Sequence, residues 1–109
     1  MIEKLTFRVT QSELERALLR LIAKARLPLP ETNVRIGPWQ LDFFWRAQQL
    51  NVEVDGHRYH SLEKAIARNY ARDADLEERG IRVRRVTARE LVNSREAVVA
   101  RIARALSGA

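Results

Sequence analysis

The stretch LNVEVDGHRYH, residues 50–60, decides the fold and raises the first question about function. Its first six residues alternate between apolar and polar side chains, which predicts a strand over residues 50–55 with Glu53 and Asp55 on one face. Both histidines of the chain follow within five residues of this strand. A basic chain thus gathers acids and histidines at the end of one strand, and this favours a site that carries out chemistry.

The segments around this strand predict an α/β fold. Before it, residues 40–45 have the pattern of a second strand, and the four-residue link Arg46–Gln49 suits a hairpin. After it, apolar spacing predicts a long helix over about residues 61–79, closed by Gly80. A strand, a helix and a further strand in this order imply a parallel pair joined by a right-handed crossover. The other strands that we expect are Asn33–Ile36, which ends at Gly37-Pro38, and Ile81–Val86.

Helices are expected at both ends of this core. Apolar residues at helical spacing predict a first helix over about residues 12–26, with Ser12 as its N-cap and Glu15 as the capping-box partner. Thr87–Glu90 has the pattern of a second capping box, which would open a short helical turn. A last amphipathic helix, over about Ser94–Leu106, is expected to pack on the sheet of its own chain, and packing on a second copy is the alternative.

The expected order is therefore α-β-β-β-α-β-α, a mixed sheet flanked by helices in one domain over residues 1–109. A short strand or arm at Leu5–Val9 would precede it. The chain has no Cys, which excludes a disulfide scaffold and a Cys-based zinc site. No signal peptide or membrane-spanning run is visible, so a soluble cytoplasmic protein is expected. The net charge of +6 favours nucleic acid as a partner, although an excess of Arg can equally reflect genome composition.

Carboxylates from both strands of the expected hairpin should meet. If the link closes symmetrically, Asp42 lies opposite Glu53 with the two Cβ atoms about 5 Å apart, and Asp55 adds a third negative charge on the same face. Like charges so close are destabilising, and a divalent cation that prefers oxygen ligands, such as Mg²⁺, removes the conflict. The alternative is a solvated acidic face on an exposed hairpin.

Polar residues also interrupt the buried stripe of the long helix. Asn69 and Asp73 share this stripe with apolar residues, and a buried carboxylate needs a partner such as Arg72 or a metal-bound water. A structural ion pair between Asp73 and an arginine is the alternative to a role in a site. His60 follows the acidic strand, where neighbouring carboxylates favour its charged form and suit it to acid–base chemistry, although a lone His is often only a loop residue.

The motifs that carry a family resemblance occur in a fixed order along the chain. They are Ser12-x-x-Glu15, Leu41-Asp42-Phe43, Val52-Glu53-Val54-Asp55-Gly56, His60, Arg72-Asp73 and Gly80-Ile81-Arg82-Val83. Together they resemble the PD-(D/E)xK nuclease superfamily, and in particular its Vsr-like branch of very-short-patch-repair endonucleases and the domain of unknown function 559. The resemblance covers about residues 12–92. It implies a restriction-endonuclease-like αβββαβ core with an extra C-terminal helix.

The resemblance also implies roles for individual residues. Asp42 would be the principal ligand of Mg²⁺, with Mn²⁺ able to replace it, helped by Glu53 or the Val54 carbonyl. Glu53 and Asp55 would complete the metal and catalytic set. Glu15 would orient a metal-bound water, and His60 would activate water or protonate the leaving group. Supporting residues on the long helix would be Asn69, Arg72 and Asp73. The basic residues that would hold the nucleic-acid backbone are Arg58, Arg68 and Arg84, unless they only form a solvated surface.

Two departures from the family pattern leave a second function open. Asn69 stands where the branch usually has an acid, and Asp55 stands where the wider superfamily has Lys. We expect a metal-dependent endonuclease that cleaves or nicks DNA, with RNA as the second choice of substrate. The alternative is a catalytically weak or inactive module on the same fold that binds nucleic acid or another protein. A homodimer or a partner protein would supply sequence specificity, unless the protein has none.

Overall fold

The computed structural model describes residues 10–56 and 62–108, and it describes side chains in the second range from residue 66 on. The predictions at Leu5–Val9, Arg58 and His60 lie outside the described residues. No helix within the described ranges is long and apolar enough to cross a membrane. The elements in chain order are α2 (Gln11–Lys24), β1 (Glu31–Ile36), β2 (Trp39–Trp45), β3 (Leu50–Asp55), α3 (Leu62–Glu78), β4 (Arg82–Thr87), α4 (Ala88–Asn93) and α5 (Arg95–Leu106).

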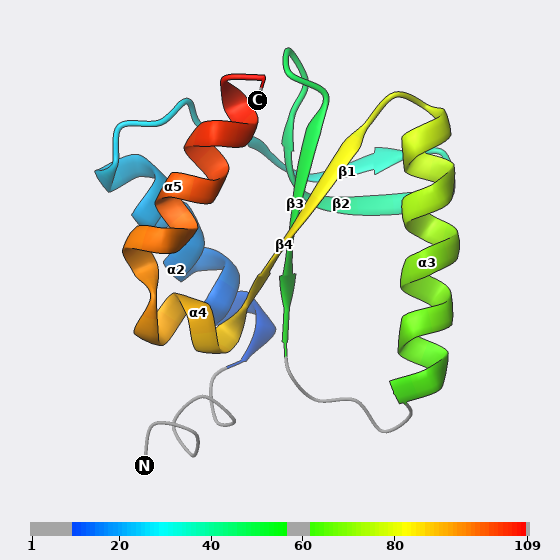
Figure 1. Ribbon diagram of the computed structural model, residues 1–109, viewed down its shortest axis with the longest axis horizontal. Coiled ribbons are helices and arrows are strands. Elements are labelled where there is room, and N and C mark those ends of the chain that lie inside the picture. The colour runs from blue at the N-terminus through cyan, green and yellow to red at the C-terminus, as the bar shows by residue number, and fades with distance from the viewer. Residues whose placement is uncertain (1–9, 57–61, 109) are drawn as a thin grey trace.

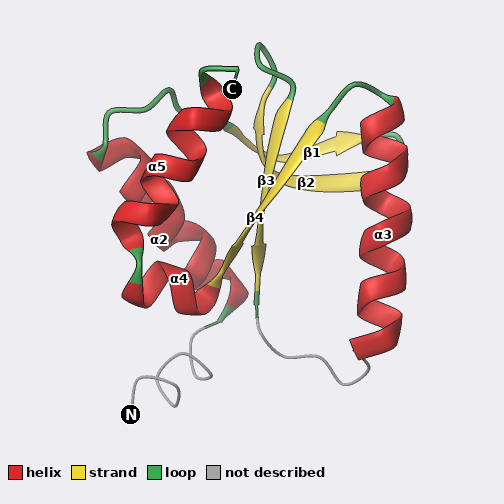
Figure 2. Cartoon of the chain, in the orientation of Figure 1, coloured by secondary structure: helices red, strands yellow, loops and turns green. Residues whose placement is uncertain are grey.

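The four strands form one mixed sheet in the order β1-β2-β3-β4, which confirms the predicted fold class. The pairs β1–β2 and β2–β3 are antiparallel, and β3 and β4 are parallel. The predicted hairpin is confirmed by the pairing of Trp45 with Leu50 across the link. The helix α3 connects the parallel pair and covers one face of the sheet, whereas α2, α4 and α5 cover the other (Figures 1 and 2).

Two clusters of buried side chains hold these layers together. The larger one lies under α2, α4 and α5, where Val52 and Val54 of β3 meet Leu18, Val98 and Ile102. Because α5 buries its apolar face in this cluster, the prediction that it packs on the sheet of its own chain is confirmed. The smaller cluster lies on the α3 side and consists of Leu41, Phe44, Leu76 and Ile81.

The first helix begins two residues earlier than the sequence indicated. Thr10, and not Ser12, is the N-cap: the Thr10 side chain accepts a hydrogen bond from the Glu13 backbone N–H at 3.1 Å, and Glu13 accepts one from the Thr10 backbone N–H at 2.9 Å. The expected pairing of Ser12 with Glu15 is therefore wrong. The reason is that two overlapping capping patterns occur here, and the earlier one satisfies the free N–H groups of the helix. As a result, Glu15 is available for another role.

Strand β2 breaks its alternation at Asp42. In a regular strand Leu41, Phe43 and Trp45 would share one face, but Leu41 packs in the cluster under α3 while the other two lie in the larger cluster. The β2–β3 pairing runs only from Trp45↔Leu50 to Phe43↔Val52, and Asn33, level with Asp42 in the β1–β2 register, has a left-handed backbone with φ of 56°. Asn tolerates this conformation better than most residues. The local irregularity frees the backbone and side chain of Asp42 from the sheet ladder.

Candidate active site

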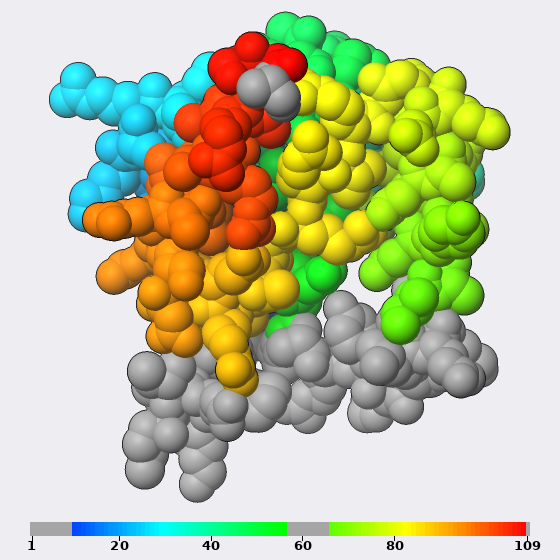
Figure 3. All heavy atoms as spheres, in the orientation of Figure 1, coloured from blue at the N-terminus to red at the C-terminus, as the bar shows by residue number. Residues whose placement is uncertain are grey.

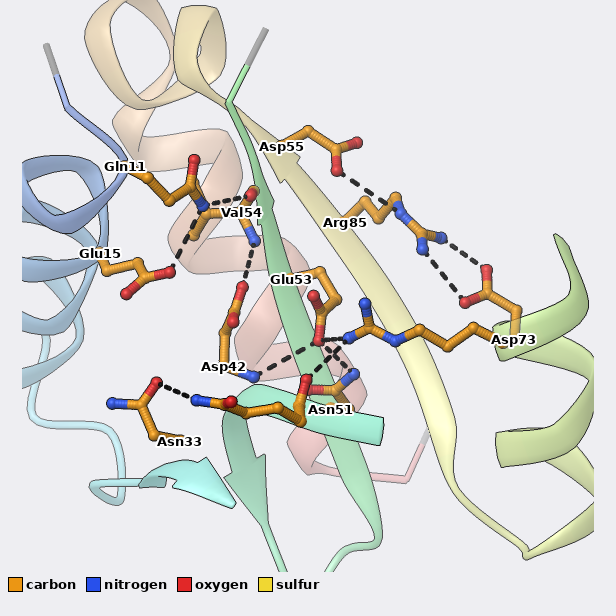
Figure 4. A network of polar contacts seen from close by, with 12 residues as sticks. Gln11, Glu15, Asn33, Asp42, Asn51, Glu53, Val54, Asp55, Asp73 and Arg85 are labelled. Carbon is orange, nitrogen blue, oxygen red and sulfur yellow. Dashed lines mark hydrogen bonds and ion pairs between the residues drawn. The ribbon is translucent and has the colours of Figure 1, made fainter. Parts of the chain in front are cut away.

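Glu53 is a buried acid, only 6% exposed, in the middle of the sheet. Its Oε2 atom forms an ion pair with Arg72 of α3. The same oxygen accepts hydrogen bonds from Asn51 Nδ2 at 2.8 Å and from the Asp42 backbone N–H at 3.4 Å (Figure 4). Because a buried carboxylate is stable only with partners, these three donors fix its position. Asn51 was not predicted as a site residue. Its position two residues before Glu53, on the same face of the strand, could have indicated that the two side chains are neighbours.

The carboxylate of Asp42 lies beside that of Glu53 and toward α2. The Val54 backbone N–H donates a hydrogen bond to Asp42 Oδ2 at 3.5 Å. Burial, and then the negative charges of Glu53 and Glu15, raise the pKa of Asp42 to about 7, and the Val54 N–H only partly opposes this. The structure therefore confirms that Asp42 and Glu53 are neighbours. Their backbones do not pair as a regular ladder, because the β2–β3 pairing ends at Phe43.

Helix α2 brings Glu15 to these acids through Gln11. Leu14 and Leu18 bury one face of the helix, and this directs the neighbouring face toward β2 and β3. Gln11 Nε2 donates hydrogen bonds to the Val54 carbonyl at 2.8 Å and to Glu15 Oε2 at 3.4 Å, so one amide ties the helix to the strand (Figure 4). Gln11 was not predicted as a site residue. The only feature of the sequence that points to it is its position one helical turn before Glu15.

Gly56 allows this close approach of helix and strand. A Cβ atom at position 56 would lie 2.7 Å from Gln11 Oε1, a distance too short for any side chain at that position unless Gln11 moves. The Val52–Gly56 motif of the sequence thus has a local physical reason, because the absent side chain leaves room for the amide that holds Glu15.

A groove of about 290 Å³ opens between α2 and the start of the β1–β2 hairpin. Glu15 and Asp42 contribute its carboxylates, Arg16 contributes a cation, and Asn33 lies on its far side. We refer to this feature as the Asp42 groove. Through this groove Glu15 and Asp42 are open to solvent.

Asp55 belongs to a second group of charges, on the side of the sheet that faces α3. Arg85 Nε lies 3.7 Å from Asp55 Oδ1, and the same guanidinium holds Asp73 through contacts of 2.5 and 3.1 Å. The pKa of Asp55 is raised overall. Burial is the largest cause, Glu53 and Asp73 add to it, and Arg85 opposes it. The alternative of an ion pair between Asp73 and an arginine is therefore confirmed, with Arg85 as the partner and not Arg72. In the parallel register Arg85 lies level with Glu53.

The remaining predicted residues lie away from the Asp42 groove or outside the described chain. Asn69 is half-buried on α3, and Arg68 is exposed on the same helix. Arg84 Nη1 donates to the Val83 carbonyl at 3.0 Å and lines a separate groove between α3 and β4. Figure 3 shows the surface of β4, in yellow, between α5 and α3. The predicted contacts of Arg68 and Arg84 with nucleic acid stay predictions.

The donor set around Asp42 fits a hard dication better than zinc. Within residues 10–56 and 66–108, no three His, Cys, Asp or Glu side chains are grouped closely enough to enclose a metal. Mg²⁺, however, is usually held by one or two carboxylates together with water and phosphate oxygens. Asp42 and Glu53 match that demand. The pKa of Asp42 is raised first by burial and then by the negative charges of Glu53 and Glu15, and a cation would relieve this second part.

Comparison with known families identifies the type of domain. The family model REase_MTES_1575, a restriction-endonuclease-like family, matches residues 14–106. The chain belongs to this family. The REase_MTES_1575 match includes Glu15, Asp42 and Glu53, and it supports a nuclease-type function for the domain. No curated protein sequence matches the chain.

A solved structure supports the same fold. The catalytic domain of the homing endonuclease I-Bth0305I is similar with a TM-score of 0.71 and 20% sequence identity, over 87% of this chain and 94% of that domain. At this identity the similarity shows the shared architecture. It agrees with the restriction-endonuclease-like core of the REase_MTES_1575 family.

Proposed function

We propose that this protein is a Mg²⁺-dependent endonuclease that hydrolyses phosphodiester bonds of DNA, with Mn²⁺ able to replace Mg²⁺. The observation that carries the proposal is the half-buried Asp42, whose pKa is raised to about 7 beside Glu53 and Glu15 at an open groove. Such a cluster costs folding energy unless a cation or a proton joins it. The family membership supports hydrolysis of nucleic acid as the chemistry.

Asp42 and Glu53 would hold the ion, and Asp55 would act as a further acid from the end of β3. When bound, Mg²⁺ would supply Lewis acidity toward a phosphoryl oxygen. Arg72 positions Glu53 through its ion pair, and the Val54 N–H positions Asp42. The residues of the chain thereby hold two carboxylates at fixed places before the substrate arrives, which is the preorganisation that catalysis requires.

Glu15 would accept a proton from a water molecule in the Asp42 groove. Gln11 restrains the Glu15 carboxylate with a hydrogen bond of 3.4 Å, and the same amide is anchored to the Val54 carbonyl. A base must be held within hydrogen-bonding reach of the water that it activates, and this anchor provides the restraint. We further propose His60 as the acid that protonates the leaving group, the role that the resemblance to the Vsr-like branch implies.

A second function is favoured by one contact. Arg72 of α3 already neutralises Glu53 by a direct ion pair, as expected of a domain that keeps its fold without a metal. A module that binds DNA or a partner protein and does not cut would retain this pair. In that case Asn69, which stands where the Vsr-like branch has an acid, would be part of the loss of activity.

Nicking of supercoiled plasmid separates these functions. We expect nicks with Mg²⁺ or Mn²⁺, none with EDTA, and none with Asp42→Asn. Glu78→Gln, at an exposed position near the end of α3, is the matched control and should cut like the native protein. Binding of DNA without metal-dependent cutting, by protein that is demonstrably folded, would favour the non-catalytic function.

A further inference from the structure

A row of cations runs along the exposed side of α2. Arg16, Arg20 and Lys24 are all exposed and follow each other every four residues, so their Cα atoms lie about 6 Å apart along the helix axis. The row lies opposite the buried face of the helix, which is formed by Leu14, Leu18 and Ile22. Three positive charges thus face solvent on the helix that carries Glu15.

Among the described residues these cations, like Arg95 at the start of α5, form no ion pair, and only Arg16 has a nearby acid, Glu13, on which its charge acts. Other arginines, by contrast, form ion pairs with acids of the chain. Among them are Arg46, Arg72, Arg79, Arg85 and Arg101. Neighbouring like charges repel each other, so the unpaired set is suited to an anionic ligand from outside the chain.

Hollows flank this row on both sides. Arg16 lines the Asp42 groove on one side of α2. On the other side, α2, α4 and α5 line an open cavity of about 720 Å³. Arg20, Lys24 and Arg95 contribute positive charge to it, and Glu96 is the only acid among its described lining residues. We call Arg16, Arg20, Lys24 and Arg95 the basic ridge. It extends from the proposed site of cleavage to the far side of the helix layer.

We propose that the basic ridge binds the sugar-phosphate backbone of the DNA strand that enters the Asp42 groove, an inference that rests on the proposed function. Glu15, Asp42 and Glu53 repel a polyanion, so cations beside the groove must supply the attraction. Arg16 contacts the phosphate nearest the groove, and the rest of the ridge contacts phosphates farther along the strand. Because phosphate contacts carry no base information, the ridge binds without sequence preference.

The test is DNA binding measured by fluorescence anisotropy, in EDTA so that no cleavage occurs, over a range of salt concentrations. Each lost phosphate contact makes the slope of log K against log salt shallower by about 0.9, so Arg20→Ala/Lys24→Ala should bind about 30-fold more weakly at 0.15 M salt. The matched control is Arg35→Ala/Arg104→Ala, which removes the same charge from exposed positions outside the ridge. It should bind within about twofold of the native protein.

The outcomes separate this inference from the proposed function. Equal losses in the two double variants, or none in either, would overturn the ridge, even if the native protein nicks plasmid. A selective loss in Arg20→Ala/Lys24→Ala supports the ridge, even if no metal-dependent cutting is seen and the nuclease proposal fails. Circular dichroism of both variants checks that they are folded, which is expected because all the replaced side chains are exposed and because Ala favours helix at Arg20, Lys24 and Arg104.

Discussion

Replacing Asp42 with Asn is expected to make the protein more stable at pH 8 while removing its proposed activity. Asn keeps an oxygen for the Val54 N–H but removes the charge that burial, Glu53 and Glu15 disfavour. The pKa of Asp42 is raised from 3.8 to about 7. Between these pH values the folded protein holds a proton that the unfolded chain has released, so stability falls as pH rises and the loss is complete above pH 7.

The size of the effect follows from the shift. At about 1.4 kcal/mol for each pKa unit, the full shift corresponds to about 4 kcal/mol. Solvent reaches the partly exposed carboxylate and screens its charge, which reduces the expected gain for Asp42→Asn at pH 8 to about 2 kcal/mol. For a domain of this length that gain raises the melting temperature by about 10 °C. At pH 4 the variant and the native protein should melt at nearly the same temperature.

Thermal unfolding followed by circular dichroism in EDTA measures this difference. The control is the same change at Asp75, whose pKa is lowered by hydrogen bonds from Trp39 Nε1 and Arg79, so that Asp75→Asn should lower the melting temperature at pH 8. An Asp42→Asn variant that melts at or below the native temperature at pH 8, or whose gain is equal at pH 4 and pH 8, would refute the reasoning.

Three further substitutions test other parts of the structure. Arg72→Ala leaves Glu53 buried without its ion-pair partner and should lower the free energy of unfolding by about 3 kcal/mol, read from urea denaturation, and a second change of Glu53 to Gln should recover part of the loss. Glu90→Gln keeps a capping acceptor but loses the charge paired with Arg101. Because the pKa of Glu90 is lowered to about 2, its contribution is present above about pH 4.5 and is lost toward pH 2, so the variant should be about 1 kcal/mol less stable at pH 7 and unchanged at pH 2. Glu15→Gln should fold normally and reduce plasmid nicking by about 100-fold, the usual contribution of a general base, and undiminished nicking would exclude that role.

The sheet could be predicted from sequence because its signals are local. Alternation over Leu50–Asp55 indicates a strand, and the capping pattern at Thr87 indicates the start of a helix. Both elements are present, as β3 and α4. The start of α2 could not be predicted in the same way, because Thr10 to Glu13 and Ser12 to Glu15 both have the capping pattern. Only the folded chain shows that Thr10 caps the helix, which releases Glu15 toward the sheet.

The candidate site was only partly predictable, because several of its contacts join distant segments. The nearness of Asp42 and Glu53 follows from the hairpin, and the sequence indicated it. The link from Gln11 to Val54 spans 43 residues and depends on how α2 packs on β3. The pairing of Arg85 with Asp73 depends on how α3 packs against β4, which no local pattern specifies.

The most direct test of a metal-dependent site is an anomalous difference map from crystals soaked in Mn²⁺. We expect one strong peak in the Asp42 groove, coordinated by carboxylate oxygens of Asp42 and Glu53, and no such peak in crystals of Asp42→Asn treated identically. A map with no peak near these two side chains at millimolar Mn²⁺, with the Glu53–Arg72 ion pair intact, would contradict the proposal that they hold the catalytic metal.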